Sequence, residues 1–343
     1  MHLKKFNMIK GKKILVVGAG GFIAGHLLKR LLKDGNSIVA TDIKPKEYWF
    51  QDFENVQNHY SMDMKDINNC RNVSKNVDYV FNMACNMGGM GFIENNKAEC
   101  MQSVLINTNL LISCKENKIK KYFFSSSACA YNKSKQQEVF IDGLKEEDAY
   151  PADPEDGYGW EKLFSERMCK HFMEDYGIQV RVARYHNIYG PFGTFDGGRE
   201  KAPAALCRKI INAKKNNTNK IEVWGDGKQT RSFLYIDDCI EGTLRLFESD
   251  FSAPLNIGSD EQVSINEMIE IIKKISGVDK LKQIHLLDKP KGVRGRSSNN
   301  DLCKKILNWS YKIQLKEGLK KTYDWINSEN SKEGSNLSKF TKS

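Results

Sequence analysis

Short apolar runs alternate with longer amphipathic segments along the first half of the chain. Residues 13–18 form a β-branched apolar run that ends in glycine, and residues 22–32 then carry apolar side chains at helical spacing. This pattern predicts a strand, a tight turn and a helix. Similar short runs predict further strands at residues 37–42, 77–82, 121–126 and 180–184.

The alternation of strands and helices predicts the fold class. Helix-length segments separate the strands, and residues 101–117 and 158–176 continue the pattern as helices. Because a crossover helix joins parallel strands, we expect an α/β fold with a doubly wound parallel sheet and helices on both faces. Beyond the last strand the alternation loosens. There we expect a smaller α+β lobe with helices at 204–213 and 264–275 and a strand at 221–224.

This organisation predicts two lobes and a tail. The first lobe spans residues 12–185, and the second, interleaved with it, spans mainly residues 186–326. Residues 327–343 are polar and rich in Lys, Ser and Asn, which predicts a disordered tail. The sequence has no run of 18 apolar residues and no apolar segment at its N-terminus, so we expect neither a membrane span nor secretion.

Cysteine content and charge exclude further classes of protein. The nine cysteines are odd in number and form no C-x-x-C pair, which argues against a disulfide framework and a structural zinc site. We therefore expect a reducing, cytoplasmic compartment and no metal. The net charge is +10, but the lysines are spread along the whole chain. A solvated basic surface is favoured over nucleic-acid binding, which stays as an alternative.

A glycine-rich turn follows the first predicted strand and opens the first predicted helix. Glycines at this point let the backbone approach a pyrophosphate, which the helix N-terminus then binds. The segment therefore predicts a dinucleotide site. The residues expected to contact the cofactor here are Gly18, Gly20, Gly21, Phe22 and Ile23.

A carboxylate at the end of the second predicted strand indicates which dinucleotide is bound. Asp42 follows Gly18 by 24 residues, where it can accept both hydroxyls of an NAD ribose and repel the 2′-phosphate of NADP. We therefore expect NAD, with Lys44 and Lys46 leaving NADP as a less favoured alternative. Asp63 is a further candidate, at the adenine pocket.

A tyrosine and a lysine form the second candidate site. Tyr158 and Lys162 lie four residues apart in a predicted helix, so their side chains share one face. Because a nearby cation lowers the pKa of a tyrosine, we expect Tyr158 to act as a general base toward a sugar hydroxyl. Lys162 would also hold the nicotinamide ribose. Ser127 ends a predicted strand 31 residues before Tyr158 and makes the combination more specific.

Together, the glycine turn, Asp42, Ser127, Tyr158 and Lys162 resemble the extended short-chain dehydrogenase/reductase family that acts on nucleotide sugars. The likeness runs from about residue 12 to 326. It implies a Rossmann-type sheet, NAD as cofactor, and a catalytic triad of serine, tyrosine and lysine.

Later segments narrow the resemblance to one branch of this family, the GDP-mannose 3,5-epimerases. Four long strings carry it, at residues 86–93, 126–129, 185–194 and 197–205. Other matches, to the family's substrate lobe and to its diphosphate-binding arginine loop, lie at residues 224–238, 255–258 and 292–296. The branch implies that GDP-mannose is oxidised at C4, inverted at C5 and C3 and re-reduced to GDP-L-galactose, with GDP-L-gulose from C5 inversion alone. It also implies a homodimer, formed through the helices predicted at 101–117 and 158–176.

A 3,5-inversion requires an acid and a base on opposite faces of the sugar ring, because a ketone at C4 acidifies the hydrogens on C3 and C5. Cys129 lies two residues after Ser127, and alternate residues of a strand share a face, so its thiol is expected to enter the site. We assign Cys129 as the base and Lys201 as the acid, a pair that the resemblance also implies.

Substrate-binding roles follow from the resemblance alone. Gly88, Gly89 and Met90 are expected to form a tight backbone wall beside the sugar, and Ser127 to bind a sugar hydroxyl. Arginine is suited to a diphosphate because its planar fork forms bidentate hydrogen bonds. The residues expected to hold the sugar and the nucleotide are Asn187, Glu200, Lys201, Lys209, Gln229, and Arg294 or Arg296.

Two positions depart from the family pattern and leave other substrates open. Asn86 stands where an aspartate is usual, and residues 130–133 lack an expected proline, so a different hexose or heptose stays as an alternative. A 4,6-dehydratase is disfavoured because Ala128 and Cys129 occupy the places of its Asp-Glu pair. A simple C4 epimerase would leave Cys129 and Lys201 unused, and a non-catalytic NAD sensor would not need the complete triad.

Overall fold

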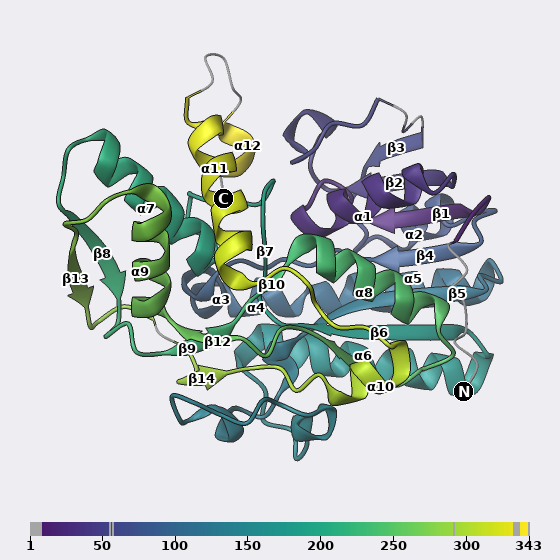
Figure 1. Ribbon diagram of the computed structural model, residues 1–343. Coiled ribbons are helices and arrows are strands. Elements are labelled where there is room, and N and C mark those ends of the chain that lie inside the picture. The colour runs from purple at the N-terminus through teal and green to yellow at the C-terminus, as the bar shows by residue number, and fades with distance from the viewer. Residues whose placement is uncertain (1–8, 55, 57, 291, 332–336, 342–343) are drawn as a thin grey trace.

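The computed structural model describes residues 9–54, 56, 58–290, 292–331 and 337–341 (Figure 1). Its central feature is a seven-stranded sheet in which every neighbouring pair is parallel. This confirms the predicted doubly wound α/β fold. Across the sheet the strands are β11 (Leu255–Ile257), β6 (Gln179–Tyr185), β5 (Lys121–Ser127), β4 (Tyr79–Asn82), β1 (Lys13–Val17), β2 (Ser37–Asp42) and β3 (Asn58–Ser61).

Helices cover both faces of the sheet, and the strand residues alternate accordingly. In β1, Ile14 and Val16 pack in the buried cluster that contains α1 (Phe22–Lys33) and α8 (Ile236–Glu248). Leu15 and Val17 pack in the opposite cluster. That second cluster is formed with helices α2 (Ile67–Val73), α5 (Ser103–Glu116) and α6 (Asp156–Tyr176).

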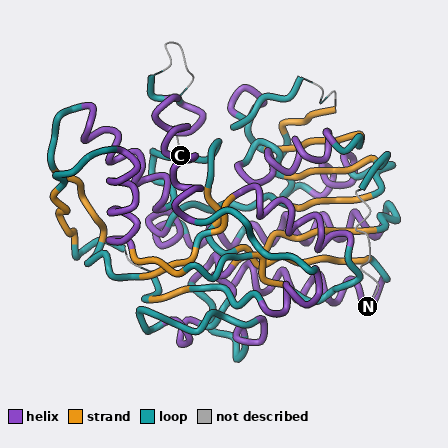
Figure 2. The backbone as a smooth tube through the Cα atoms, viewed as in Figure 1, coloured by secondary structure: helices purple, strands orange, loops and turns teal. Residues whose placement is uncertain are grey.

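A smaller lobe lies at one end of the sheet, on the left of Figures 1 and 2. Its principal helix α9 (Ile265–Ser276) begins at Ser264, whose hydroxyl accepts from the backbone of Glu267 while the Glu267 carboxylate accepts from Ser264, a capping box. The other elements of this lobe are α7 (Ala202–Lys215), α11 (Leu315–Glu329), and strands β8 (Lys220–Trp224), β9 (Thr230–Ser232), β12 (Gln262–Ser264), β13 (Lys282–Leu286) and β14 (Gly295–Arg296).

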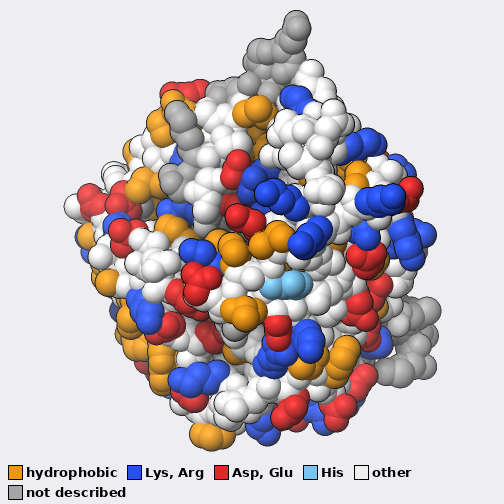
Figure 3. All heavy atoms as spheres, turned by 90° about the vertical axis from the view of Figure 1, so that its left-hand side faces the viewer, with side chains coloured by type: hydrophobic (Ala, Val, Ile, Leu, Met, Phe, Trp, Pro, Cys, Tyr) orange, Lys and Arg blue, Asp and Glu red, His pale blue; other side chains and the backbone are white. Residues whose placement is uncertain are grey.

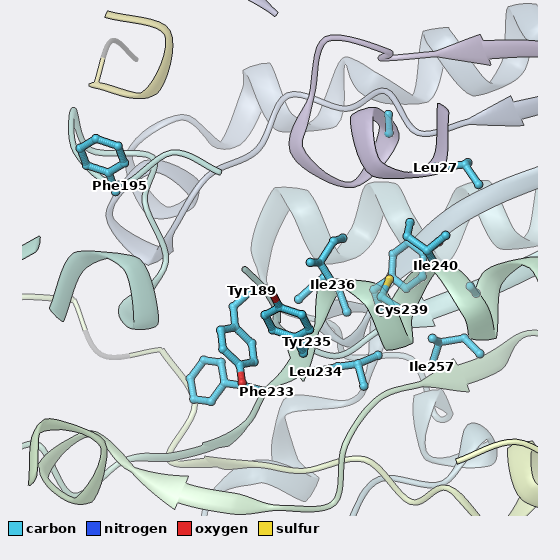
Figure 4. Packing of buried hydrophobic residues seen from close by; sticks show 14 of the residues in the cluster. Leu27, Tyr189, Phe195, Phe233, Leu234, Tyr235, Ile236, Cys239, Ile240 and Ile257 are labelled. Carbon is cyan, nitrogen blue, oxygen red and sulfur yellow. The ribbon is translucent and has the colours of Figure 1, made fainter. Parts of the chain in front are cut away.

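The chain passes back and forth between the lobes. β11 and α8 follow the first strands of the smaller lobe in sequence but pack on the large sheet. Figure 4 shows the resulting core, where Leu27 of α1, Ile240 of α8 and Ile257 of β11 lie around one apolar centre. The remaining elements are α3 (Met90–Asn95), α4 (Lys97–Met101), β7 (Ile188–Tyr189), β10 (Leu234–Tyr235), α10 (Asp301–Leu307), α12 (Ser338–Thr341) and short 3-10 turns η1 (Lys46–Tyr48), η2 (Ala128–Ala130), η3 (Lys133–Gln136) and η4 (Glu146–Ala149).

Three elements differ from the sequence-based expectation. β3 was not expected, because all four of its residues are exposed at the edge of the sheet and carry no apolar alternation. The helix predicted at 101–117 is divided into α4 and α5 at Gln102. The prediction that residues 327–343 form a disordered tail is wrong for residues 327–329 and 338–341, which are helical, and residues 332–336, 342 and 343 lie outside the described residues. α11 continues to Glu329, and Phe340 of α12 is buried against Phe50 and Trp325.

The surface carries no concentrated basic stripe on the face that Figure 3 presents, where Lys and Arg side chains are mixed with Asp and Glu. Within the described ranges, no helix is long and apolar enough to cross a membrane. All nine cysteines are free thiols. In the same part of the chain, His, Cys, Asp and Glu side chains form no group suited to hold a metal ion.

Candidate active site

A cavity of about 930 Å3 opens at the carboxyl ends of β1 and β4, where the strand order of the sheet reverses. In doubly wound sheets this is the usual place for a ligand. We call it the switch-point cavity. The predicted site residues that line it are Gly18, Gly21, Phe22, Ile23, Asp42, Asp63, Ser127, Tyr158 and Lys201. A more open groove along α9 contains none of the predicted residues.

The glycine turn after β1 has no room for side chains. Gly18 has a φ of +80°, and a β-carbon there would lie 2.9 Å from the backbone of Ala84, which follows β4. At Gly20, a β-carbon would lie 2.5 Å from the Trp49 ring. α1 begins directly after Gly21 without a side-chain cap, so the amides of its first turn are open to a ligand at the cavity.

Asp42 lies beside this turn at the end of β2. Its two carboxylate oxygens accept from the backbone amides of Gly20 and Lys44, each at 2.9 Å. Burial raises the pKa of Asp42, whereas Lys44 and the backbone donors lower it. The Lys44 ammonium donates to the Gly20 carbonyl and lies over the Phe50 ring. Asp63 lines the same cavity. This arrangement fits a dinucleotide whose ribose hydroxyls meet Asp42, as expected for NAD.

Tyr158 and Lys162 project from α6 and are both buried. Lys162 Nζ lies 5.5 Å from the centre of the Tyr158 ring and 3.4 Å from Glu161 Oε2. Lys162 Nζ makes no hydrogen bond within the described residues. The hydroxyls of a bound ribose would therefore supply acceptors for this buried donor. Burial raises the pKa of Tyr158 well above its usual range, and a hydrogen bond with Ser127 acts against this. The expectation of a lowered Tyr158 pKa is therefore wrong, because the ammonium faces the ring and burial dominates.

Cys129 lies next to Ser127 but is not among the residues that line the switch-point cavity, and it does not belong to the strand from which its position was predicted. β5 ends at Ser127, and Cys129 lies in the 3-10 turn η2. The backbone amide of Cys129 donates to Ser127 Oγ at 3.2 Å. Arg296 Nη1 donates to Cys129 Sγ at 3.4 Å. Burial raises the pKa of the thiol, Arg296 lowers it, and Glu155 raises it further. The environment thus favours the thiol over the thiolate that the sequence led us to expect.

Lys201 is the N-cap residue of α7 and lines the switch-point cavity. Burial lowers the pKa of its ammonium, and Cys129 acts in the opposite direction. This interaction places Lys201 within electrostatic reach of Cys129. Burial also brings the pKa of Lys201 closer to neutral pH, where a group that exchanges protons with a substrate is most effective.

Two glycine-containing loops pack directly on one another beside these residues. A β-carbon on Gly88 would lie 3.1 Å from Arg199 Cα, and the Gly89 amide donates to the Arg199 carbonyl at 3.0 Å. Met90 lies against Gly292. The predicted backbone wall therefore holds the segment that immediately precedes Lys201.

Asn86, which departs from the family pattern, also contacts the segment before Lys201, through hydrogen bonds of its side chain. Its side-chain oxygen accepts from Arg199 Nη1 at 2.8 Å, and its amide nitrogen donates to Glu99 at 3.1 Å. Arg199 also lies 3.7 Å from the centre of the Phe92 ring. Asn86 thus lines the cavity, but its side chain is hydrogen-bonded to both Arg199 and Glu99.

The remaining predicted substrate residues lie outside the residues that line the cavity, and most are engaged. Asn187 donates to the Ser232 carbonyl and Lys209 to the Glu222 carbonyl. Glu200 accepts from the Gly198 amide and from Arg208. Gln229 is buried and has no partner for its side-chain oxygen within the described residues.

The two candidate arginines are held very differently. Arg294 forms a bidentate pair with Asp226 at 2.9 Å and is partly exposed. Arg296 is buried and bound to Gln136, Glu155 and Cys129. Only Arg294 is therefore placed where a diphosphate could recruit it by displacing a surface carboxylate. Arg296 belongs to the surroundings of the thiol.

Glu155 is the site residue that sequence reasoning missed. It lies immediately before α6, and its carboxylate accepts from Arg296 Nη2 at 2.6 Å. The single signal in the sequence was a carboxylate at the start of the helix that carries Tyr158, which is common in helices of any function.

Comparison with known proteins agrees with this geometry. A model of the NAD dependent epimerase/dehydratase family matches residues 14–258. The chain is 48% identical to the GDP-mannose 3,5-epimerase of Arabidopsis thaliana over 332 residues, which cover 96% of this chain and 86% of that protein. It is 49% identical to GDP-mannose 3,5-epimerase 1 of Oryza sativa subsp. indica over 322 residues, 94% of this chain and 83% of that protein.

Solved structures show the same fold. UDP-glucuronic acid 4-epimerase from Bacillus cereus, in complex with UDP-glucuronic acid and NAD, matches with a TM-score of 0.78 and 26% identity. The match covers 92% of this chain and 99% of that chain. The predicted resemblance to nucleotide-sugar epimerases is therefore confirmed by sequence and by structure.

Proposed function

The chain belongs to the NAD dependent epimerase/dehydratase family, and from that premise we propose that it acts as a GDP-mannose 3,5-epimerase. The reaction oxidises C4 of GDP-mannose, inverts C5 and C3, and reduces C4 again to give GDP-L-galactose, with GDP-L-gulose when only C5 is inverted. Similarity to the two plant enzymes supports this proposal. The observation that carries it is the loop ending in Lys201, which packs on Gly88 and Gly89 and brings Lys201 within electrostatic reach of Cys129.

The cofactor of this family is NAD. When bound, it accepts a hydride from the sugar C4 and returns it at the end, so that none is consumed. The glycine turn and the open amides of α1 would hold its pyrophosphate, and Asp42 the adenosine ribose. Asp63 would lie at the adenine end and Lys162 at the nicotinamide ribose.

Tyr158 moves the proton of the C4 hydroxyl. Its phenolic oxygen accepts this proton as C4 is oxidised and returns it as C4 is reduced. Ser127 stabilises the deprotonated phenol through its hydrogen bond, against the burial that disfavours the charge. Ser127 would also bind the C4 oxygen and keep it beside Tyr158.

Cys129 and Lys201 act on the 4-keto sugar. The ketone makes the C5 and C3 hydrogens acidic, and each inversion removes a proton from one face and delivers another from the opposite face. The two side chains come from separate elements, η2 and the residue before α7, and interact electrostatically. They are therefore suited to work from opposite sides of one ring.

A different nucleotide hexose or heptose is the second candidate substrate. Asn86 favours it, because an amide stands where an aspartate is expected beside the sugar pocket. The Asn86 side chain is hydrogen-bonded to Arg199 and Glu99. Asn86 would therefore affect the sugar indirectly, by determining where the segment that contains Arg199 lies.

The proposal extends to a homodimer. Met101 and Leu105, near the junction of α4 and α5, and Trp160 and Phe164 on α6 are all large apolar residues between 44% and 52% exposed. Trp160 and Phe164 are four residues apart and share one helix face. α4 and α5 both pack against α6. A second copy of this chain would cover the combined apolar face.

A reducing, cytoplasmic compartment is supported by nine free thiols.

The test is incubation of the purified protein with GDP-mannose without added NAD, followed by NMR identification of the products. We expect GDP-L-galactose and GDP-L-gulose from the natural protein and neither from Tyr158→Phe. A folded protein that retains NAD and leaves GDP-mannose unchanged would overturn the substrate assignment. The same assay with other nucleotide hexoses would then test the second candidate.

A further inference from the structure

The short helix α12 contributes to the wall of the switch-point cavity. Ser338 and Lys339 line this cavity together with Phe50, which follows η1, and with Gly193 and Thr194. α12 lies beside α11 and between the sheet and the smaller lobe (Figure 1). The cofactor cavity therefore has a wall segment that comes from a part of the chain remote from the glycine turn.

Phe340 anchors this wall segment from behind. Its side chain is 5% exposed, and its ring centre lies 5.5 Å from that of Phe50 and 6.0 Å from that of Phe195. A third aromatic ring, that of Trp325 on α11, lies 5.1 Å away. Phe50 lines the cavity, and Phe195 directly follows the cavity residue Thr194. Phe340 therefore joins two parts of the cavity wall that are distant in sequence.

Backbone hydrogen bonds fix α12 to the loop that leads to Lys201. The Phe340 carbonyl accepts from the amides of Phe195 at 3.1 Å and of Asp196 at 3.4 Å. Arg208 on α7 donates to the Phe195 carbonyl at 2.7 Å and lies 3.2 Å from the Asp196 carboxylate. One side of the α12 contact is thus held by the helix that Lys201 caps.

The other side of the contact reaches the glycine turn. The Phe50 amide donates to the Gly20 carbonyl at 3.2 Å. The Lys44 ammonium donates to the same carbonyl at 2.9 Å and lies 3.9 Å from the centre of the Phe50 ring. The Gly20 amide donates to Asp42. Phe340 therefore packs on a residue that is bound directly to the proposed pyrophosphate and ribose site.

Lys339 holds α12 through an ion pair. Its ammonium lies 3.0 Å from Asp52 Oδ1. The Lys339 side chain is 14% exposed and that of Asp52 is 78% exposed, so the cation belongs to the cavity wall and its partner to the surface. A cation on this wall would also attract the pyrophosphate of a dinucleotide, which carries two negative charges.

We propose that residues 338–340 form a clasp over the cofactor cavity, and that NAD enters and leaves when Phe340 detaches from Phe50 and Phe195. The proposal rests on NAD as the cofactor of the family and not on the identity of the sugar. Displacement of the strand ends or sheet helices that form other walls would break the main core. A single helical turn can detach at a lower cost in free energy.

Slow cofactor exchange suits the proposed reaction. NAD is reduced and then oxidised again within each catalytic cycle, so it has no need to leave between cycles. A clasp that opens rarely would keep the cofactor bound while substrate and product exchange.

The test follows the cofactor without turnover. NADH changes its fluorescence on binding, so stopped-flow mixing with the apo protein gives the rate of uptake, and a chase with excess NAD gives the rate of release. The informative variant is Phe340→Ser, which removes the anchor and leaves the residues that line the cavity unchanged. The matched control is Leu319→Ala, which opens the same apolar cluster from α11 at a residue outside those that line the cavity.

In Phe340→Ser we expect release and uptake to be faster by about tenfold or more, because loss of a buried aromatic anchor shifts the clasp toward its detached state. The dissociation constant should change less than either rate, since a gate acts on both directions. Leu319→Ala should exchange NADH at the natural rates. Unchanged release in a folded Phe340→Ser protein would overturn the proposal. Faster release with unchanged uptake would also overturn it, because α12 would then be an ordinary contact of the cofactor.

A surface variant replaces this test if Phe340→Ser does not fold. Asp52→Lys turns the attraction toward Lys339 into repulsion, at an exposed position outside the residues that line the cavity. Both rates should then rise by about twofold to fivefold, as expected for an exposed ion pair. Asp324→Lys, which reverses an exposed carboxylate paired with Lys320 on α11, should leave both rates unchanged. Natural rates in Asp52→Lys would contradict the clasp.

The result is distinguishable from failure of the proposed function. A natural protein whose NADH exchange is accelerated by Phe340→Ser, but which does not epimerise GDP-mannose, would contradict the function and leave the clasp standing. Normal epimerisation, with natural rates of NADH exchange in Phe340→Ser, would contradict the clasp alone.

Discussion

The Glu200 carbonyl oxygen lies so close to Gly89 that a β-carbon on this glycine would be 2.4 Å away from it. This contact joins the loop after β4 to the residue immediately before Lys201. The position of a proposed acid-base residue therefore depends on the absence of a side chain more than 100 positions earlier in the sequence.

Gly89→Ala should consequently displace Lys201 and lower kcat by about tenfold or more, since small misplacement of a reacting group is costly. The protein should still fold and retain NAD, because the contact is remote from the glycine turn. Natural activity in Gly89→Ala would show that the loop contact is irrelevant to catalysis.

Removal of the Asp42 carboxylate should weaken NAD binding. A hydrogen bond to a charged group contributes about 1.5–3 kcal/mol, so Asp42→Ala should bind NAD about tenfold to a hundredfold more weakly. The loss of charge should also reduce the discrimination against NADP, because Lys44 lies beside the same position. Titration of the apo protein with both cofactors checks this. Asp324→Asn, which removes an exposed carboxylate paired with Lys320 on α11, should behave as the natural protein.

The buried His186 predicts a specific dependence of stability on pH. Burial lowers the pKa of His186 from 6.5 to about 3 in the folded protein, while its Nε2 donates to Asn256. The unfolded chain therefore binds one more proton between pH 6.5 and about 3. Stability supplied by the neutral ring is complete above pH 6.5 and is lost as the pH falls toward 3, by about 1.4 kcal/mol per unit.

Urea unfolding at pH 7 and pH 5 measures this slope. In His186→Asn the loss between the two pH values should be smaller than in the natural protein, by about 2 kcal/mol in the limit of a single titrating group. A natural slope retained in His186→Asn would assign the effect to other groups.

The exposed apolar face on α4, α5 and α6 predicts the oligomeric state. Phe164→Glu places a charge at the centre of the proposed interface and should convert a dimer into a monomer, as measured by light scattering coupled to size exclusion. Phe140→Ser is the control, since Phe140 is also exposed but lies outside these helices. A natural protein that is monomeric at micromolar concentration would contradict the dimer.

The sequence predicted the sheet and the cofactor turn because both depend on local patterns. Apolar runs and the spacing from Gly18 to Asp42 are readable without tertiary contacts. β3 was missed because an exposed edge strand needs no apolar alternation. Phe340 was assigned to a disordered tail because its aromatic partner Phe50 is remote in sequence, and its other partner, Trp325, lies before the predicted start of the tail.

In the site, the sequence did not predict which distant residues contact the reacting groups, because a local sequence pattern carries no information about contacts between remote segments. Cys129 was foreseen as a site residue, but β5 ends before it. Burial raises the pKa of its thiol, and Arg296 and Glu155 from other segments modify that effect. Arg296 was grouped with Arg294 because both belong to one loop string. One residue, Gly295, separates the partly exposed guanidinium of Arg294 from the buried one of Arg296.

Incorporation of solvent deuterium at C3 and C5 tests the central claim most directly. The purified protein is incubated with GDP-mannose in D2O without added NAD, and the sugars are examined by NMR and mass spectrometry. The account predicts deuterium at C5 and C3 of the new GDP-hexoses, with both signals lost in Cys129→Ala and Lys201→Met. Inversion at C4 without ring deuterium, or no reaction by a folded protein that holds NAD, would contradict it.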